Sequence, residues 1–477
     1  MGDIAGAGVQ AALLRIWDEA ACRRVHDASL RLLDGTGVEM KHERARALCA
    51  AAGARVDGSR VRFPGRLVDE ALAAAPRSWE LRPRGGRTTP LALTDGPSYY
   101  GTGPDCLYVR DPETGERRRA VLMDVTRAAA VAEALPNVDF VMSMGLPEDV
   151  PGDLVDVLQF GAMLKGTHKP IVVSSPFMGA SLYTMAEMAA ACGEAGSFAC
   201  LAMSSPPLML DAVCCDKTLA CAELQVPLVL AASVSAGAQG PASLAACVAV
   251  ANAEVLAGLV VHQLARPGAP FVFGVGTGVM NMRTLVDPYG SPGVFAANQA
   301  HVDLIKWYGL PSWSYAGHSD SKLLDEQWAL DLGVSTVLGT LSRATLLHDQ
   351  GYLETGLQSS LEGIVLADEV AGWAKAFAAG VAVGDDDLAV AEAEAAGPGG
   401  SHLGRKMTRA RHRGFWQPGL TDHRTHEQWL AAGGETLLER TRRRLRELLA
   451  AAPPSLLDPE TDAVIDDLAS GRREEHA

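Results

Sequence analysis

Tyrosine, histidine and acidic side chains recur at places where short apolar runs of the chain end. The candidate ligand-binding residues are Tyr99, Tyr100, Tyr315, His318, Asp320, Lys322, His348, Tyr352 and Glu354. This set is rich in aromatic rings and carries few formal charges. A phosphate site needs basic side chains and a hydrolytic metal site needs clustered ligands, so neither fits the set. The flanks of Tyr315 and Tyr352 are too polar for a pure core, which favours a role for both rings at a site. No residue is assigned as catalytic.

Sequence motifs for other chemistries are incomplete or absent. Residues Gly274–Gly278 read GVGTG, but Val279 stands where a dinucleotide fingerprint needs its last glycine, and no acidic ribose partner follows at the usual spacing. We therefore expect a flexible loop after a strand. The chain contains no GxSxG elbow, no HExxH zinc motif and no P-loop. Its nine cysteines form no CxxC pair, which predicts free, buried thiols and no bound metal.

Eight short apolar runs alternate with helical stretches from Tyr99 onward. They span residues 99–103, 138–144, 170–175, 198–204, 227–233, 271–275, 312–316 and 345–349. Strands that alternate with crossover helices form a parallel sheet, and eight such units predict a closed (β/α)8 TIM barrel, an α/β fold. Reacting groups in such barrels lie at the carboxyl ends of the strands, where we expect the candidate residues. A doubly wound open sheet is the alternative, but it requires no particular count of eight.

The barrel leaves an extension at each end of the chain. We expect residues 1–97 to form a mainly helical N-terminal extension, residues 98–360 the catalytic barrel and residues 361–477 a C-terminal helical region. At 477 residues, with 48% hydrophobic and 21% charged residues, the chain can bury a large core.

Charge and hydropathy exclude two classes of partner. A net charge of −15 argues against nucleic-acid binding, which needs a positive face. The apolar stretch 242–264 is interrupted by Asn252, Glu254 and His262, so a buried barrel helix is expected there and no membrane span. The amino terminus lacks the basic and apolar regions of a signal peptide, which predicts a cytoplasmic protein.

Several segments, taken in their order along the chain, resemble the trimethylamine methyltransferase family. The segments are His26–Leu30 with Gly37-Val38, Asp111–Arg118 (DPETGERR), Gly237–Pro241 (GAQGP), Glu254–Gly258 (EVLAG), Asp287–Pro292 (DPYGSP), Gly317–Asp325 (GHSDSKLLD), His348–Glu354 (HDQGYLE) and Gly397–Gly400 (GPGG). The resemblance runs from about His26 to Arg440 and is strongest with the branch that lacks pyrrolysine, which includes glycine betaine methyltransferases. Met407-Thr408 stands where the family commonly shows a His-Thr pair.

The resemblance implies methyl transfer from a methylated, quaternary amine such as a betaine to the Co(I) corrinoid of a partner protein. A corrinoid nucleophile on a partner removes the need for a triad, an activated thiol or a tightly bound cofactor in this chain. The chain must instead hold the methylated nitrogen and orient it. Aromatic faces with a carboxylate nearby hold such a cation, and the five residues suited to this cage are Tyr99, Tyr100, Tyr315, Tyr352 and Glu354. His348, Lys322 or serine hydroxyls would serve as donors to a betaine carboxylate.

Two other functions remain open from the sequence. A barrel of this kind could pass the methyl group to another carrier, such as tetrahydrofolate. It could also bind betaine-like ligands without catalysis. A homo-oligomer is compatible with the sequence.

Overall fold

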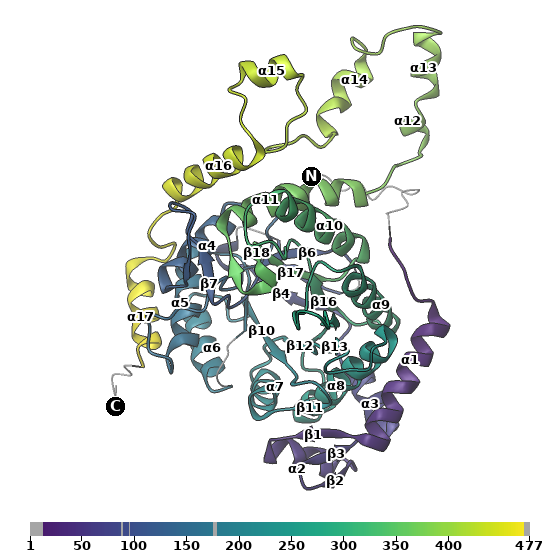
Figure 1. Ribbon diagram of the computed structural model, residues 1–477, viewed down its shortest axis with the longest axis vertical. Helices are drawn as coiled ribbons and strands as arrows, with labels where there is room; N and C mark the ends of the chain where they lie inside the picture. The colour runs from purple at the N-terminus through teal and green to yellow at the C-terminus, as the bar shows by residue number, and fades with distance from the viewer. Residues whose placement is uncertain (1–12, 87–88, 95, 175–178, 472–477) are drawn as a thin grey trace.

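A computed structural model describes residues 13–86, 89–94, 96–174 and 179–471. Among these residues, seven parallel strands form one curled sheet at the centre of the protein (Figure 1). In spatial order the strands are β6 (Tyr99–Thr102), β17 (Leu346–Gln350), β16 (Ser312–Tyr315), β14 (Phe271–Gly274), β12 (Leu228–Ala231), β10 (Phe198–Met203) and β9 (Ile171–Val173). Each corresponds to one of the eight predicted runs.

The remaining predicted run, 138–144, lies between the two edge strands of this sheet. Phe140 forms a parallel bridge to Gly101 of β6, and Val141 forms a parallel bridge to Ile171 of β9. Only these two residues pair, so the run is a pair of single bridges rather than a strand. The backbone turns away directly afterwards, since Met144 has a φ of 61°.

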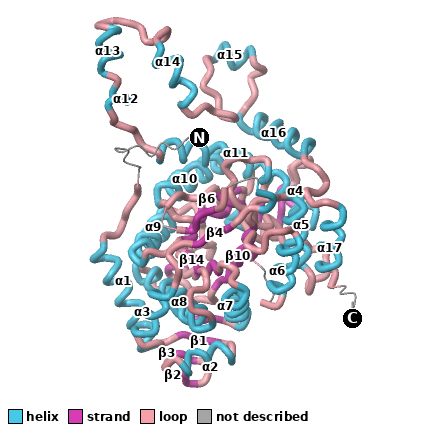
Figure 2. Tube along the Cα trace, turned by 180° about the vertical axis from the view of Figure 1, so that it is seen from behind, coloured by secondary structure: helices cyan, strands magenta, loops and turns pink. Residues whose placement is uncertain are grey.

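Helices that follow the strands of the sheet and the run 138–144 pack on the outside of the sheet (Figure 2). They are α4 (Leu122–Glu133), α5 (Val155–Gly166), α6 (Ser181–Ala191), α7 (Ala212–Leu224), α8 (Leu244–Ala265), α9 (Pro292–Tyr308), α10 (Glu326–Ser342) and α11 (Leu361–Ala378). Side chains of Asp211, Ser291, Asp325 and Ser360 cap four of them by accepting a backbone N–H. Helix α8 is long and apolar enough to cross a membrane, but most of it is buried inside the protein, as expected for a barrel helix.

Side chains on the inner face of the sheet form an apolar core that closes its amino end. This core includes Phe140, Leu201, Trp313 and Leu346. A hairpin of β4 (Trp79–Leu81) and β5 (Leu91–Leu93) adds Leu81, Leu91 and Leu93 to it. The plugged amino end leaves the opposite, carboxyl end of the strands for a site.

Short strands form smaller sheets around the curled sheet. Strands β18 (Tyr352–Leu353), β19 (Gln358–Ser359), β7 (Tyr108–Arg110) and β8 (Arg117–Arg119) make one sheet, and β13 (Ser235–Ala236) pairs with β15 (Gly278–Val279). These strands follow the carboxyl ends of β17, β12, β14 and β6 in the chain. They therefore fix the loops from which a pocket at that end is built.

The N-terminal extension combines helices with a small sheet. Its elements are α1 (Glu19–Arg31), a single π-helical turn (Leu32–Thr36), β1 (Val38–Met40), α2 (Glu43–Ala51), β2 (Arg55–Asp57), β3 (Arg60–Arg62) and α3 (Gly65–Ala74). Strand β1 pairs in parallel with β11 (Met209–Leu210), and α1 and α3 pack on α8. The extension is thereby joined to the α7–α8 side of the sheet.

The C-terminal region consists of further helices, some of which project from the body (Figure 1). The helices are α12 (Asp385–Leu388), α13 (Val390–Ala396), α14 (Lys406–Arg411), α15 (His426–Ala431), α16 (Leu437–Ala451) and α17 (Pro459–Ala469). Helix α16 packs against α11, and α17 packs against α5 and α6. Between α11 and α16 the chain runs outward and returns.

Candidate functional site

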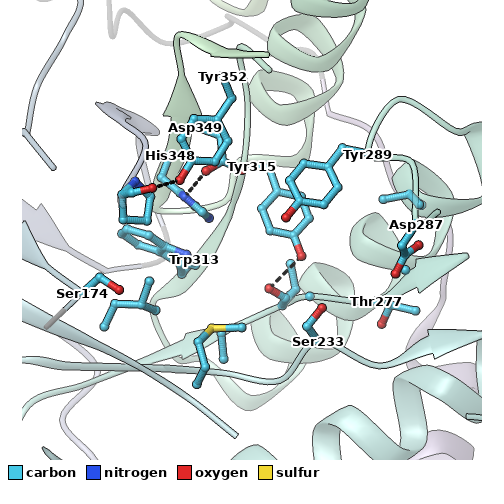
Figure 3. A pocket seen from close by; sticks show the side chains of 18 of the residues that line it. Ser174, Ser233, Thr277, Asp287, Tyr289, Trp313, Tyr315, His348, Asp349 and Tyr352 are labelled. Carbon is cyan, nitrogen blue, oxygen red and sulfur yellow. Dashed lines mark hydrogen bonds and ion pairs between the residues drawn. The ribbon is translucent and has the colours of Figure 1, made fainter. Parts of the chain in front are cut away.

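A cavity of about 210 Å³ opens at the carboxyl ends of the parallel strands (Figure 3). Its walls come from the ends of β9, β10, β12, β14, β16 and β17 and from the loop that joins β15 to α9. The polar and aromatic lining residues are Ser174, Ser233, Thr277, Asp287, Tyr289, Trp313, Tyr315, His348, Asp349 and Tyr352. Among the described residues, the lining contains two carboxylates and no lysine or arginine.

Aromatic rings pack on one another along one wall of the cavity. Tyr289 and Tyr315 are stacked, with ring centroids 6.1 Å apart and planes 8° from parallel. Trp313 stacks on His348 at 4.3 Å, and Tyr315 meets the same His348 ring edge-on at 5.4 Å. The Tyr315 hydroxyl donates to the backbone carbonyl of Val275. Each ring is therefore held in place before any ligand arrives.

Tyr352 reaches the cavity from β18, just beyond the end of β17. Its hydroxyl donates to the carbonyl of Pro104, which also lines the cavity. The ring lies directly over Gly103, where a Cβ atom would stand 2.0 Å from Cε1 of Tyr352. A side chain at position 103 would therefore displace the ring.

Asp287 enters the cavity from the loop before α9. Its Oδ1 atom accepts a hydrogen bond from the backbone N–H of Val279. Its carboxylate lies against Gly278, where a Cβ atom would stand 2.2 Å from Oδ2. The last glycine of the GVGTG segment thus gives space to a carboxylate, and the segment is the predicted loop after a strand rather than a nucleotide cradle.

Asp349, the second carboxylate, has an unusual backbone. Its φ is 79°, a conformation that residues other than glycine rarely adopt and that concentrates at functional sites. The side chain is buried, and Oδ1 lies 2.6 Å from Nδ1 of His348. This close contact is not an aligned hydrogen bond, because neither atom has a hydrogen-bond partner of good geometry.

The phenol groups of the cavity remain protonated at neutral pH. Burial raises the pKa of Tyr289, Tyr315 and Tyr352 above the ordinary value, and the nearby Asp349 charge adds to the shift. The three residues therefore present neutral rings with a negative face, which attract a cation.

Of the nine residues that the sequence singled out, Tyr315, His348 and Tyr352 line the cavity. Two more support it from behind. His318 is buried and meets the rings of Tyr289 and Tyr315 edge-on at 5.7 and 6.2 Å, and burial lowers its pKa. Asp320 accepts hydrogen bonds from the backbone N–H groups of Tyr289 and Gly290 and so fixes the Tyr289 loop.

The other four residues lie elsewhere. Lys322 is exposed and donates to the carbonyl of Asp320. Glu354 forms a two-pronged ion pair with Arg117, at 2.7 and 3.0 Å. Its carboxylate is therefore engaged by an arginine instead of facing the cavity.

Tyr99 and Tyr100 are placed away from the cavity by the direction and alternation of β6. Tyr99 is the first residue of the strand, so it lies at the amino end, where it packs against the core beneath the cavity. Tyr100 points to the opposite face of the sheet, and its hydroxyl lies 2.6 Å from Oγ1 of Thr340 on α10. Neither ring belongs to the same cage as Tyr315 and Tyr352.

The described ranges offer no metal-binding cluster. These contain no group of three or more histidine, cysteine or acidic side chains that could hold a metal ion. All nine cysteines are free, as expected, and eight of them are buried.

Comparison with known proteins places the chain in a family. The family described as "Trimethylamine methyltransferase (MTTB)" matches residues 8–477. The chain belongs to the trimethylamine methyltransferase family. This confirms the resemblance seen in the sequence and makes the chain a member of a family of methyltransferase enzymes.

Relatives in this family match along nearly their whole length. The chain is 29% identical to a glycine betaine methyltransferase of Desulfitobacterium hafniense strain Y51, over 96% of this chain and 97% of that protein. It is 26% identical to the trimethylamine methyltransferase MttB of Desulfitobacterium hafniense strain DSM 10664 / DCB-2, over 95% and 92% of the two chains. The crystal structure of the Methanosarcina barkeri monomethylamine methyltransferase MtmB aligns with a TM-score of 0.50 at 12% identity, over 92% of this chain and 95% of that one. That likeness concerns the fold alone.

Four acidic or aromatic lining residues of this family member were not singled out from the sequence: Asp287, Tyr289, Trp313 and Asp349. Three of them stood inside motifs that carried the family resemblance. Asp287 and Tyr289 belong to DPYGSP, and Asp349 belongs to HDQGYLE. Trp313 lies inside β16 between Ser312 and Ser314, outside those motifs, and offers no comparable signal.

Proposed function

We propose that the chain transfers a methyl group from a quaternary amine, such as a betaine, to the Co(I) corrinoid of a partner protein. The observation that carries this proposal is the composition of the cavity wall. Four aromatic side chains, Tyr289, Trp313, Tyr315 and Tyr352, line the cavity together with Asp287 and Asp349, and no described lining residue is a lysine or arginine.

A cavity of this kind favours a permanent cation. Each aromatic face contributes about 0.5–2 kcal/mol to binding a quaternary ammonium group. A carboxylate in a partly water-free cavity adds a Coulombic attraction that bulk solvent screens little. Asp349 is buried, so water screens the interaction of its carboxylate with a bound cation only weakly.

The reaction requires neither a nucleophile nor a proton donor from this chain. A Co(I) corrinoid supplies the nucleophile when it is bound beside the cavity. The C–N bond of a quaternary amine breaks with its electron pair on nitrogen, so the amine leaves neutral and needs no proton donor. The tasks left to the protein are to hold the cation, to exclude water and to orient one methyl group toward the opening.

The cavity edge offers a surface on which a corrinoid protein could dock. The segment 278–288 starts and ends at lining residues, and between them Met282 and Leu285 are 65% and 72% exposed. Met203, at the end of β10, is also exposed at the cavity. These apolar side chains around the opening fit a partner that covers it.

The bridges of Phe140 to β6 and of Val141 to β9 support a closed eight-stranded barrel in which this segment is the eighth member. We place the reaction in the cytoplasm, as the sequence predicts.

A methyl-transfer assay tests the proposal. The purified chain is mixed under anaerobic conditions with free Co(I)-cobalamin and, in turn, glycine betaine, choline, tetramethylammonium and trimethylamine. We expect loss of the Co(I) absorption and formation of methylcobalamin with at least one quaternary amine, and a loss of this rate in Asp349→Asn. Lys322→Ala, outside the cavity, is the matched control and should keep the rate.

If none of the four amines methylates cobalamin, the proposal is contradicted. Methyl transfer to tetrahydrofolate without any corrinoid would favour the folate-linked alternative. Calorimetric binding of a quaternary amine without turnover, even with a corrinoid protein present, would favour a ligand-binding protein without catalysis.

A further inference from the structure

Residues 380–419, here called the arm, project from the body between α11 and α16, as does α15 after them (Figure 1). The arm contains α12, α13 and α14, each of four to seven residues. No residue of the arm is buried. Helices this short are not stable in water by themselves, and ordering them costs conformational entropy that only burial can offset. The arm therefore needs a surface that a single chain does not provide.

Large apolar side chains stand open along the arm. Val381 is 80% exposed, Leu403 is 87% exposed and Phe415 is 72% exposed. At the base of the arm, on α11, Trp373 and Phe377 are stacked with planes 1° apart and are 44% and 53% exposed. Apolar side chains that recur in this way along one projecting segment are typical of an interaction surface rather than of solvent-facing loops.

The arm also has a distinctive order of charges. Its first limb, residues 385–394, carries five acidic side chains, and its second limb, residues 405–413, carries five basic ones. The five negative and five positive charges sum to zero over the arm, whereas the whole chain has a net charge of −15. The arm is thus a segment through which two copies of an acidic chain can approach without net repulsion.

Ion pairs within one arm use only part of these charges. Arg405 pairs with Glu392, and Arg411 pairs with Asp387. Within the described part of the chain, Asp385, Asp386 and Glu394 have no ion-pair partner, and neither do Lys406, Arg409 and Arg413. Each limb of the arm therefore keeps three charged side chains that no ion pair within the described residues uses.

We propose that the arm associates with the arm of a second copy of this chain. A two-fold axis sets the acidic limb of each copy against the basic limb of the other, since such an axis brings the same surface of both copies together in opposite directions. The exposed Leu403 and Phe415 side chains are then covered by the partner copy, with the Trp373–Phe377 pair as an adjoining apolar platform. This association does not depend on the proposed methyl transfer.

Charge reversal in each limb tests the proposal on the full-length chain. The first variant, Arg409→Glu with Arg413→Glu, has two acidic limbs, and the second, Asp385→Arg with Asp386→Arg, has two basic limbs. We expect the native chain to have a mass by light scattering of at least twice 50.1 kDa. We expect each variant alone to dissociate at protein concentrations at least tenfold higher than the native chain does. An equimolar mixture of the two variants should recover the native mass, because their limbs are complementary again.

A control variant carries the same change of charge outside the arm. Arg24→Glu with Arg31→Glu alters two exposed residues of α1 and should keep the native mass. Unchanged thermal melting of all variants shows that none has unfolded. A native chain that runs as a single copy, a reversed variant that keeps its mass, or a mixture that fails to reassociate would each overturn the proposal. Association that occurs only with a corrinoid protein would assign the arm to that partner and overturn it as well.

Discussion

Nδ1 of His348 lies 2.6 Å from Oδ1 of Asp349, and both side chains line the same cavity. The two residues are neighbours in sequence, and on a regular strand they would point to opposite faces. They meet because Asp349 has a φ of 79°, which turns its side chain to the side that His348 occupies. The irregular end of β17 thereby places a carboxylate and an imidazole in one cavity.

Asp349→Asn is expected to weaken cation binding without disturbing the backbone. Asparagine tolerates a positive φ better than most residues, so the chain at position 349 can keep its conformation. The variant removes one buried negative charge, and we expect the affinity for choline to fall about tenfold or more, equal to about 1.4 kcal/mol or more. Isothermal calorimetry measures the change. Asp153→Asn, an exposed position on the surface, should leave the affinity as it is.

Tyr352 should contribute to the binding of the cation mainly through its aromatic ring and less through its hydroxyl group. Tyr352→Phe keeps the ring over Gly103 and loses only the bond to the Pro104 carbonyl, whereas Tyr352→Ala removes the ring. We expect Tyr352→Ala to lower the affinity for choline by about 0.5–2 kcal/mol, a factor of about 2 to 30, and Tyr352→Phe to lower it less.

The neutral analogue of choline, with carbon in place of nitrogen, separates charge from shape. This analogue should bind the native chain more weakly than choline does. Its affinity should also fall less than that of choline when Tyr352→Ala removes the ring. Equal affinity for the two ligands, or no loss in Tyr352→Ala, means that no aromatic cage exists at this position.

His348 should discriminate between ligands with and without a carboxylate. It is the one described lining side chain that can carry a positive charge. His348→Phe keeps a ring that can stack on Trp313 and removes the N–H donors. We expect glycine betaine to lose affinity about tenfold while choline loses less or gains, since the carboxylate of the betaine loses its donor. A parallel loss for both ligands, measured by calorimetry, would show that His348 serves only to pack the wall.

The sequence predicted the sheet well because its signal is local. Runs of β-branched and apolar residues mark strands that are buried on both faces, and seven of the eight runs became strands of one parallel sheet. The run 138–144 has the same composition, but Met144 turns the chain away and only Phe140 and Val141 pair. A backbone dihedral of this kind leaves no trace in hydropathy.

The sequence predicted lining residues of the candidate site only where their position along a strand determines that they face the cavity. Tyr315 ends β16, Tyr352 follows β17 and His348 lies within β17, and all three line the cavity. The prediction that Tyr100 lines the site is wrong because a shift of one residue along β6 turns a side chain to the other face of the sheet. Glu354 is engaged by Arg117, more than two hundred residues away in sequence, and Asp287 arrives on a loop that only the folded chain brings to the cavity. Such long-range contacts are beyond the reach of local patterns.

Glu254 on α8 should make the stability of the protein depend on pH. Its buried carboxylate accepts hydrogen bonds from the Ser204 hydroxyl at 2.5 Å and from the Leu208 backbone N–H at 2.6 Å. Burial raises its pKa from 4.5 to about 7, against the smaller opposing effect of these two donors. The folded state therefore binds more protons than the unfolded state between these two pH values.

Because the folded pKa is the higher one, the native state loses stability as pH rises from about 4.5 to about 7, and the loss is complete above that range. At 1.36 kcal/mol per pH unit, the loss attributable to Glu254 is about 3 kcal/mol. Glu254→Gln removes the titration, and its amide oxygen can still accept from Leu208 while its amide group donates to Ser204. The variant should match the native chain at about pH 5 and exceed its free energy of unfolding by up to about 3 kcal/mol at about pH 8.

Urea unfolding of the native chain and of Glu254→Gln at both pH values measures this difference directly. Glu113→Gln, at an exposed position, controls for the loss of one acidic group and should follow the native chain at both pH values. Curves for the native chain and Glu254→Gln that shift in parallel between the two pH values would place the Glu254 carboxylate in its ionised form throughout. In that case the hydrogen bonds from Ser204 and Leu208 offset the cost of burying its charge.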